Sequence, residues 1–212
     1  MKKLLYVEEN FITPDECQTF IDYANANRKE MPYGGKSRGG DTFLSSITTE
    51  GHQHVHEITG PTGNPQDDGE GCAAYLGGDA DFINMKLEKA EFFRQVVDKV
   101  TNVCKYFDDR ANLDYVGVVR WPIGTFMNPH YDNSSRDGIY DIFAAMLYLN
   151  DDFDGGHTGF ENFEITPKQG QLCIFSNSQY KHHVTKVESA ERFVLSFWYN
   201  NAKPVLELEQ TP

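Results

Sequence analysis

The sequence predicts an α+β domain in which two helices support a jelly-roll core of antiparallel strands. Two observations predict this fold class. Apolar residues recur with helical spacing in two segments, one after Pro14 and one between Asn84 and Phe107. Beyond residue 110, short apolar runs follow one another and are separated by Gly and Pro turns. A chain of 212 residues is long enough for a full core, and we expect residues 1–212 to form a single domain.

The first helix is expected to begin beside Thr13, after a short strand or extended segment at Tyr6–Ile12. Thr13 as N-cap, Pro14 at the first helical position and Glu16 three residues after the cap match a capping box. Apolar residues follow at i, i+3, i+4 and i+7, namely Cys17, Phe20, Ile21 and Ala24. This face should lie on a sheet, so we interpret the helix as structural.

Residues 29–80 are rich in Gly and poor in aliphatic residues. So long a segment without a clear pattern inside a compact domain is usually a functional loop or a disordered one. We interpret it as a loop that covers or lines a substrate groove, and so as a candidate lid. His52, His54 and His56 alternate within it and could bind zinc on one face of a strand. An exposed polar loop is the preferred interpretation, since no cysteine or carboxylate is placed to complete the shell.

The second helix has an apolar stripe, for which core packing is favoured over a membrane or partner-binding role. The stripe consists of Leu87, Phe93, Val96, Val97, Val100, Val103 and Phe107. The strands expected after it are Tyr115–Trp121, Phe143–Leu149, Phe160–Thr166, Gln171–Phe175, His183–Val187 and Arg192–Tyr199. Their close spacing along the chain predicts antiparallel pairing.

Composition limits the binding partners and the cellular compartment that we expect for this protein. The net charge of −13 argues against nucleic acid and anionic membranes as partners. Residues 1–10 contain no apolar stretch long enough for export or for spanning a bilayer, so we expect a cytoplasmic protein. The four cysteines form no Cys-x-x-Cys pair, which is typical of reduced thiols. They are Cys17, Cys72, Cys104 and Cys173.

The strongest chemical signal is His130-Tyr131-Asp132. An imidazole and a carboxylate two residues apart on an extended strand point to the same side. A histidine from a distant strand would complete a two-histidine, one-carboxylate metal site. Such a site leaves open coordination positions and is the ligand set of non-haem Fe(II) oxygenases. His-x-Asp alone is a weak signal, so the surrounding motifs decide whether it belongs to a metal site.

Several motifs recur together in a fixed order. They are Arg120-Trp121-Pro-Ile-Gly124, His130-x-Asp132, Tyr148-Leu149-Asn150, Gly155-Gly156-x-Thr158-x-Phe160, His182-x-Val184-x-x-Val187 and Arg192. In this order the sequence resembles the 2-oxoglutarate- and Fe(II)-dependent dioxygenases of the prolyl 4-hydroxylase superfamily. The resemblance is close over residues 115–199 and loose over residues 10–27. It implies that the jelly-roll is a cupin-like double-stranded β-helix with supporting N-terminal helices.

The resemblance implies that His130, Asp132 and His182 are the catalytic iron ligands. His183 is the alternative third ligand. His182 is preferred because Val184, Val187 and the basic residue Arg192 then stand two, five and ten positions after it, as in the family. By strand alternation His183 should face the other side, as a packed or exposed neighbour.

The resemblance also assigns residues to the 2-oxoglutarate site. Arg192 would bind the distal carboxylate through paired charge-assisted bonds, Tyr148 would add a hydroxyl bond, and Thr158 would form part of the wall. For Tyr148 a core aromatic role is the alternative. Trp121 stands where many members have tyrosine, and it would stack on the substrate or simply pack. Arg120 could be a substrate-facing charge or a rim residue.

The activity implied by the resemblance is hydroxylation, with release of succinate and CO2. A prolyl residue in a peptide or protein is the leading substrate, and a free amino acid or another small molecule is the alternative. Relatives that demethylate nucleic acid have a second arginine shortly after the first, and residues 193–201 contain none. The implied cofactors are Fe(II), 2-oxoglutarate, O2 and ascorbate. A non-catalytic, metal-binding cupin-like module is the remaining alternative.

Overall fold

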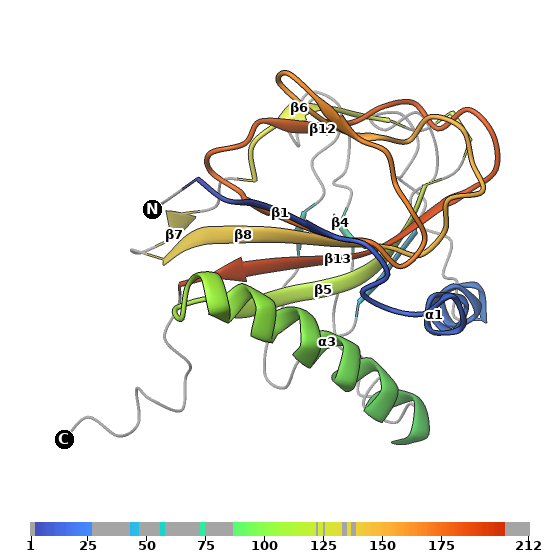
Figure 1. The fold of residues 1–212 in the computed structure, drawn as a ribbon, viewed down its shortest axis with the longest axis horizontal. Coiled ribbons are helices and arrows are strands. Elements are labelled where there is room, and N and C mark those ends of the chain that lie inside the picture. Colours follow the sequence, from blue (N-terminus) through green and yellow to red (C-terminus); the bar gives the residue numbers. More distant parts are fainter. Residues whose placement is uncertain are drawn as a thin grey trace.

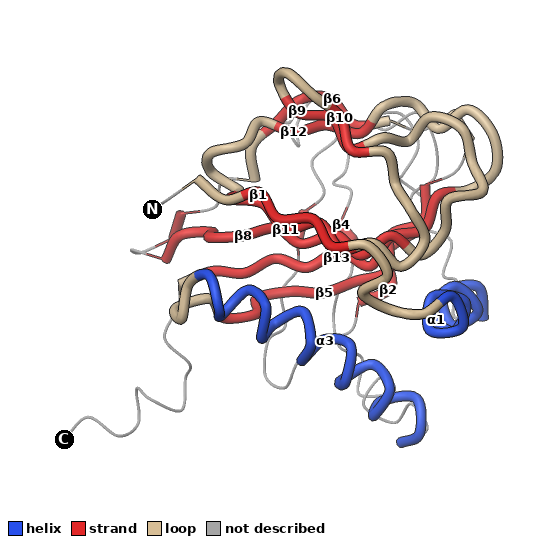
Figure 2. The backbone as a smooth tube through the Cα atoms, in the orientation of Figure 1, coloured by secondary structure: helices blue, strands red, loops and turns tan. Residues whose placement is uncertain are grey.

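The structure is a computed structural model that describes residues 3–26, 43–46, 56–57, 73–74, 87–121, 123–124, 126–132, 135–136 and 139–201. In these residues, strands form two main antiparallel sheets (Figures 1 and 2). The large sheet has the order β1-β11-β8-β13-β5-β2, and β7 pairs with β8. Its strands are β1 (Leu5–Glu8), β2 (Phe43–Ser46), β5 (Asn112–Trp121), β7 (Ser135–Arg136), β8 (Ile139–Tyr148), β11 (Leu172–Ser176) and β13 (Arg192–Asn200).

The small sheet has the order β10-β9-β12-β6 and lies above the large sheet in Figure 1. Its strands are β6 (Met127–His130), β9 (Thr158–Phe160), β10 (Glu164–Ile165) and β12 (His182–Val184). A separate pair consists of β3 (His56–Glu57) and β4 (Ala73–Ala74). These two strands and β2 lie within the segment that was expected to be a loop. Of the three histidines in that segment, His56 lies in β3, whereas His52 and His54 lie outside the described residues. The predicted lid lies largely outside them as well, so its role stays a prediction.

Among the described residues, the helices α1 (Pro14–Ala26) and α3 (Leu87–Phe107) flank the large sheet. Helix α3 runs along the face turned away from the small sheet (Figure 1). The predicted capping box is confirmed, because Glu16 N–H donates to Thr13 Oγ1 at 3.2 Å and Thr13 N–H donates to Glu16 Oε2 at 2.8 Å. No helix among the described residues combines the length and the apolar character that a membrane span requires.

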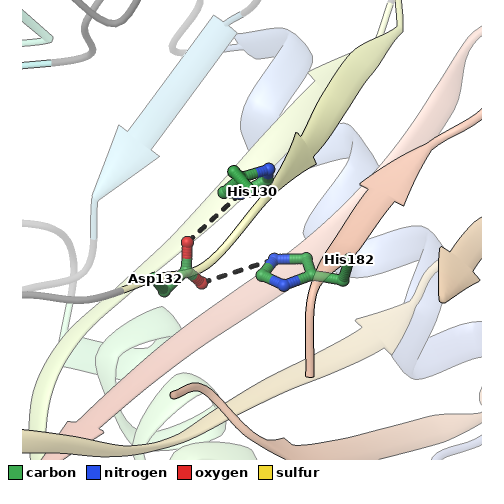
Figure 3. Close-up of side chains that lie close together, drawn as sticks. All are labelled: His130, Asp132 and His182. Atoms are coloured by element: carbon green, nitrogen blue, oxygen red, sulfur yellow. Dashed lines mark ion pairs between the residues drawn. The ribbon is translucent and has the colours of Figure 1, made fainter. Parts of the chain in front are cut away.

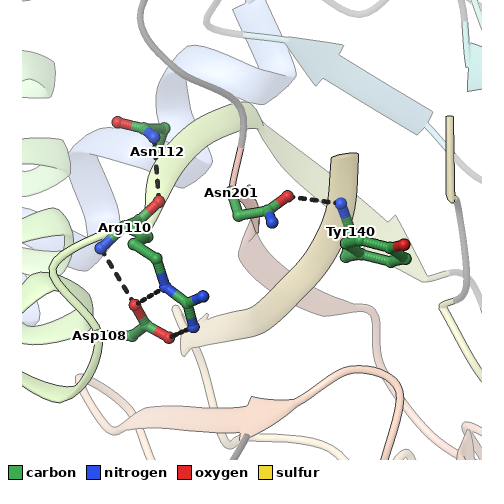
Figure 4. A network of polar contacts seen from close by, with 5 residues as sticks. All are labelled: Asp108, Arg110, Asn112, Tyr140 and Asn201. Atoms are coloured by element: carbon green, nitrogen blue, oxygen red, sulfur yellow. Dashed lines mark hydrogen bonds and ion pairs between the residues drawn. The ribbon is translucent and has the colours of Figure 1, made fainter. Parts of the chain in front are cut away.

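The chain after α3 turns back into the sheet through a short polar network (Figure 4). The Arg110 guanidinium donates to both oxygens of Asp108, at 2.9 and 2.7 Å, and lowers the pKa of that carboxyl group. At the same end of the sheet, Tyr140 N–H donates to Asn201 Oδ1 at 2.6 Å (Figure 4). The two contacts fix the ends of β5, β8 and β13.

Strand alternation gives the large sheet two different faces. In β13, Phe193, Leu195 and Phe197 belong to the core under the helices, which includes Phe93 and Val100 of α3. The intervening residues face the small sheet. Val194, for example, packs with Tyr148, Cys173, Phe175 and Phe160. Functional side chains on this second face are therefore enclosed between the two sheets.

Several strand bounds differ from the prediction, and two predicted strands differ most. Residues 160–166 divide between β9 and β10, and the predicted strand at 183–187 is β12, which ends at Val184. The chain also changes sheets between β5 and β6, so His130 does not continue the strand that contains Trp121. Gly124 has φ 89° at this crossover, a conformation that glycine adopts without strain, and its N–H donates to Val187 O at 2.7 Å.

Candidate active site

His130, Asp132 and His182 converge between the ends of β6 and β12 (Figure 3). Each offers one ligand atom, and these atoms all lie within 4.8 Å of one another. His130 and His182 are direct partners across the two strands, with ring centroids 4.3 Å apart. Asp132 lies just beyond the end of β6, with Oδ1 3.2 Å from His130 Nε2 and Oδ2 3.5 Å from His182 Nε2. The motif pair and the distant histidine are thus brought together.

Backbone contacts orient both imidazoles in the same way. Nδ1 of His130 is 2.8 Å from Asn128 O, and Nδ1 of His182 is 3.3 Å from Tyr180 O. A carbonyl only accepts, so each Nδ1 donates its proton and each Nε2 keeps its lone pair. Both lone pairs lie on the side of Asp132. This arrangement is typical of metal-binding histidines.

The electrostatics favour neutral histidine beside an ionised carboxylate. Burial lowers the pKa of His182, and the opposing charge of Asp132 offsets this only in part. Burial alone would raise the pKa of Asp132, but its contacts with His130, with His182 and with the Trp198 indole N–H together lower it. A neutral imidazole at His182 and an ionised carboxylate at Asp132 are protonation states that a divalent cation requires of its ligands. The donor set therefore fits iron.

His183 is placed differently. Its ring packs on Gly159 of β9, where an added Cβ would come within 2.1 Å of the ring. The metal-binding cluster found among the described residues contains His182 and not its neighbour. Alternation along β12 accounts for the difference.

Arg192, at the start of β13, is 1% exposed. Its guanidinium carbon lies 5.3 Å from the ring centroid of Trp121 and 5.6 Å from that of Tyr148. A terminal nitrogen donates to Thr158 Oγ1 at 3.4 Å, and Nε has no hydrogen-bond partner among the described residues. Burial lowers the pKa of this guanidinium to about 10. A buried cation with an unpaired donor fits a carboxylate ligand, since such a charge is costly without a counter-charge.

The three other residues predicted near Arg192 take distinct positions. Trp121 is its strand partner at the end of β5. The Tyr148 hydroxyl donates to Thr158 Oγ1 at 2.7 Å, and burial raises the pKa of that hydroxyl. Thr158 is fully buried. Arg120 lies on the opposite face of β5, beside Val118 of the helix-side core, and forms an ion pair with Glu191. Its predicted substrate contact stays a prediction.

Two residues that support the site were not singled out by the sequence. The Trp198 indole N–H donates to Asp132 Oδ2 at 3.1 Å. The Asn150 side chain donates to Glu191 O and accepts from Phe193 N–H, both at 2.7 Å. Asn150 belongs to the quoted Tyr-Leu-Asn motif, so the motif was a signal for it. For Trp198, 66 residues from its partner, no local pattern exists.

A glycine pair lets the chain pass close to Arg192. Gly155 and Gly156 have φ of 70° and 60°. A Cβ on Gly156 would lie 2.9 Å from Cδ of Arg192, closer than real Cβ contacts allow. Gly156 N–H donates to Lys186 O at 3.0 Å, which keeps this turn against the strand that follows β12.

Comparison with known proteins shows which proteins this chain is similar to. Residues 116–200 match the family model described as the 2OG-Fe(II) oxygenase superfamily. A relative named "Putative prolyl 4-hydroxylase" from Acanthamoeba polyphaga mimivirus is 28% identical over 124 residues, 48% of this chain and 51% of the relative. Prolyl 3-hydroxylase 2 from Mus musculus is 33% identical over 76 residues, 32% of this chain and 11% of that protein. The chain thus spans about half the length of the first relative.

Solved structures show the same fold. A viral collagen prolyl hydroxylase from Paramecium Bursaria Chlorella virus-1, in complex with 2-oxoglutarate, aligns with a TM-score of 0.60 and 18% identity over 93% of this chain and 96% of that one. A prolyl-4-hydroxylase from Pseudomonas putida aligns with a TM-score of 0.56 and 16% identity over 94% and 93%. The predicted double-stranded β-helix is confirmed.

Together these findings show that residues 116–200 match the 2OG-Fe(II) oxygenase superfamily, and that the chain is similar to prolyl 4-hydroxylases in part of its sequence and in its fold. Fe(II), 2-oxoglutarate and O2 are the cofactors that this family implies.

Proposed function

We propose that the protein is a 2-oxoglutarate- and O2-dependent hydroxylase that acts on prolyl residues in a peptide or protein. The observation that supports it most is the buried Arg192, which has an unpaired Nε on the same enclosed face of the large sheet that packs against His182. The connection passes through Phe175, whose ring lies 4.7 Å from the His182 ring and which packs in one cluster with Tyr148. This arrangement supports the proposal that a site for a divalent metal and a site for a carboxylate lie in the same layer between the sheets.

In this proposal His130, Asp132 and His182 are the catalytic residues that hold Fe(II). The Nε2 atoms of the histidines and one oxygen of Asp132 are the donors. The backbone carbonyls of Asn128 and Tyr180 keep both rings in the binding orientation. Three protein donors leave positions for the co-substrate and O2.

Arg192 binds the distal carboxylate of 2-oxoglutarate. Tyr148 supplies a second donor, because its hydroxyl can turn from Thr158 toward the incoming carboxylate. Thr158 then keeps its contact with Arg192. Trp121 stands where many members of the family have tyrosine. Its indole ring packs against the Arg192 guanidinium, and it has no hydroxyl that could donate a hydrogen bond to the co-substrate.

When bound, Fe(II) and 2-oxoglutarate supply the oxidation: O2 is consumed, 2-oxoglutarate yields succinate and CO2, and one oxygen atom enters a substrate C–H bond. The protein orients the co-substrate through Arg192 and keeps water away from the enclosed layer. No acid or base side chain is needed for this chemistry. The role of ascorbate stays a prediction.

The prolyl substrate is supported by the nature of the relatives. Prolyl hydroxylases occur among both the sequence relatives and the structural neighbours. One structural neighbour, from Trichoplax adhaerens, was solved with a peptide fragment of the hypoxia inducible factor oxygen degradation domain. A peptide or protein is therefore the partner that we propose, on a single domain that spans residues 1–212.

The test is an aerobic incubation with Fe(II), 2-oxoglutarate and a panel of proline-containing peptides and free proline. Succinate release and product mass are read together in the wild type, in Asp132→Ala and in the control Asp109→Ala, whose side chain is exposed. Gain of one oxygen on peptidyl proline, lost only in Asp132→Ala, is the expected result. Oxidation of free proline alone would favour the small-molecule alternative. If metal binds and neither succinate nor oxidised product forms, a non-catalytic module is favoured.

A further inference from the structure

The chain has two tryptophans, and both lie in the candidate site. Trp121 packs over Arg192, and Trp198 donates its indole N–H to Asp132 Oδ2 at 3.1 Å. We propose that Trp198 is a positioning residue that makes Asp132 bind the metal through one oxygen only. The inference rests on the metal-binding part of the proposed function and goes beyond it, because it concerns how the carboxylate is held.

The need for such a bond follows from where Asp132 lies. The two histidines are fixed by the pairing of β6 with β12. Asp132 is beyond the last residue of β6, outside that ladder. A carboxylate at the end of a strand has rotational freedom that would weaken metal binding unless a second group orients it.

Trp198 is well placed to supply this orientation. It lies within β13, which is paired on both sides, with Tyr115 of β5 and with Ala144 of β8. The indole is thus anchored in the centre of the large sheet, and its N–H reaches across to the carboxylate between the sheets. A rigid donor fixes its acceptor better than a loop side chain could.

The two oxygens of Asp132 are made different by this contact. Oδ2 accepts the indole proton and also lies 3.5 Å from His182 Nε2, whereas Oδ1 lies closer to an imidazole, 3.2 Å from His130 Nε2, and accepts no indole proton. An indole can donate but cannot bind a metal, so it occupies Oδ2 without competing for the cation. Oδ1 is then the oxygen offered to the metal. A carboxylate that binds through one oxygen leaves three positions of an octahedral ion open, and one that binds through two leaves only two.

The matched variants are Trp198→Phe and Tyr199→Phe. The first keeps an aromatic ring and removes the indole N–H. The second removes a buried hydroxyl bond, that of Tyr199 to Thr101 at 3.1 Å, from the next residue and the opposite face of the same strand. If Trp198 only fills space, the two changes should have similar effects on the metal site.

The experiment titrates each metal-free protein with Mn(II), and with Co(II) for the absorption spectrum, which reports coordination number. We expect Trp198→Phe to bind Mn(II) 10- to 100-fold more weakly, the range typical for loss of a group that orients a ligand, and to show an altered Co(II) spectrum. Tyr199→Phe should match the wild type in both. Equal affinity and an unchanged spectrum in Trp198→Phe would overturn the inference.

A second measurement uses the unaltered protein, in case Trp198→Phe does not fold. With ¹⁵N-labelled indoles, two N–H resonances are expected, and Zn(II) should shift that of Trp198 while leaving it protected from solvent exchange. A Trp198 resonance that exchanges freely with solvent and does not shift with Zn(II) would contradict the proposal.

The variants also separate failure of this inference from failure of the proposed function. If the wild type itself shows no metal binding that depends on Asp132, the metal site of the proposed function fails as well. If Asp132→Ala loses binding and Trp198→Phe does not, only the present inference fails.

Discussion

Asn150 holds the backbone on both sides of Arg192. Its amide group donates to Glu191 O and its oxygen accepts from Phe193 N–H, each at 2.7 Å. Arg192 is therefore fixed from the end of the neighbouring strand β8, and the direction of its guanidinium depends on a side chain that does not touch it.

We expect Asn150→Ala to weaken 2-oxoglutarate binding by about tenfold, since two hydrogen bonds worth ~1 kcal/mol each support the arginine backbone. Isothermal titration of the Mn(II)-loaded protein with 2-oxoglutarate measures this, and Mn(II) affinity should not change. Asp152→Ala is the control, because it removes only the exposed contact of the same amide group. Equal affinities in both variants would show that Asn150 has no such role.

Arg192→Met should make the ligand-free protein more stable and abolish its response to 2-oxoglutarate. The variant removes a buried guanidinium whose Nε lacks a partner among the described residues, and a buried ion without a counter-charge has a desolvation penalty of several kcal/mol that its removal relieves. Urea unfolding with and without 2-oxoglutarate is the measurement. A wild type that gains no stability from 2-oxoglutarate, or a variant that still does, would remove Arg192 from the co-substrate site.

His182→Ala should abolish iron-dependent turnover, whereas His183→Ala should retain much of it. His182 takes part in the metal-binding cluster, and the His183 ring packs on Gly159 instead. Fe(II) affinity and succinate release measured together distinguish lost binding from lost folding. The reverse pattern would mean that the ligand is misassigned by one residue.

The metal-free protein should lose stability as the pH falls below about 6.5, the ordinary pKa of histidine. Burial lowers the pKa of folded His182, so the unfolded chain takes up a proton at a pH where the folded one does not. Stability from this group is complete above pH 6.5 and falls by at most ~1.4 kcal/mol per pH unit below it. Urea unfolding at pH 7.5 and 5.5 should show a smaller loss in His182→Gln than in the wild type. Equal losses would contradict the assigned direction.

Local patterns predicted much of this fold for identifiable reasons. The Thr13–Glu16 capping box depends on residues three apart, and the motifs from residue 115 to 199 occur in the order typical of the family. Both could therefore be predicted from the sequence alone. Strand bounds could not, because β6 begins only after a sheet crossover that Gly124 allows. Alternation on β5 likewise separates Arg120 from Trp121, which neighbouring positions in the sequence do not reveal.

Contacts between segments that are distant in the sequence could not be predicted from it. The Trp198–Asp132 bond depends on how far the small sheet stands from the large one, and the Asn150 contacts depend on how the turn before β13 closes. His182 was preferred over His183 through motif spacing, and the structure places His182 in the metal-binding cluster. The segment around His52 and His54 lies outside the described residues.

The most direct test of the central claim is turnover under ¹⁸O2 with Fe(II), 2-oxoglutarate and an unmodified peptide that the protein hydroxylates. One labelled oxygen should enter succinate and one should enter the peptide, in equal amounts of the two products, and both should vanish in Asp132→Ala. Unlabelled succinate, or peptide oxidation that continues without 2-oxoglutarate, would contradict the proposed function.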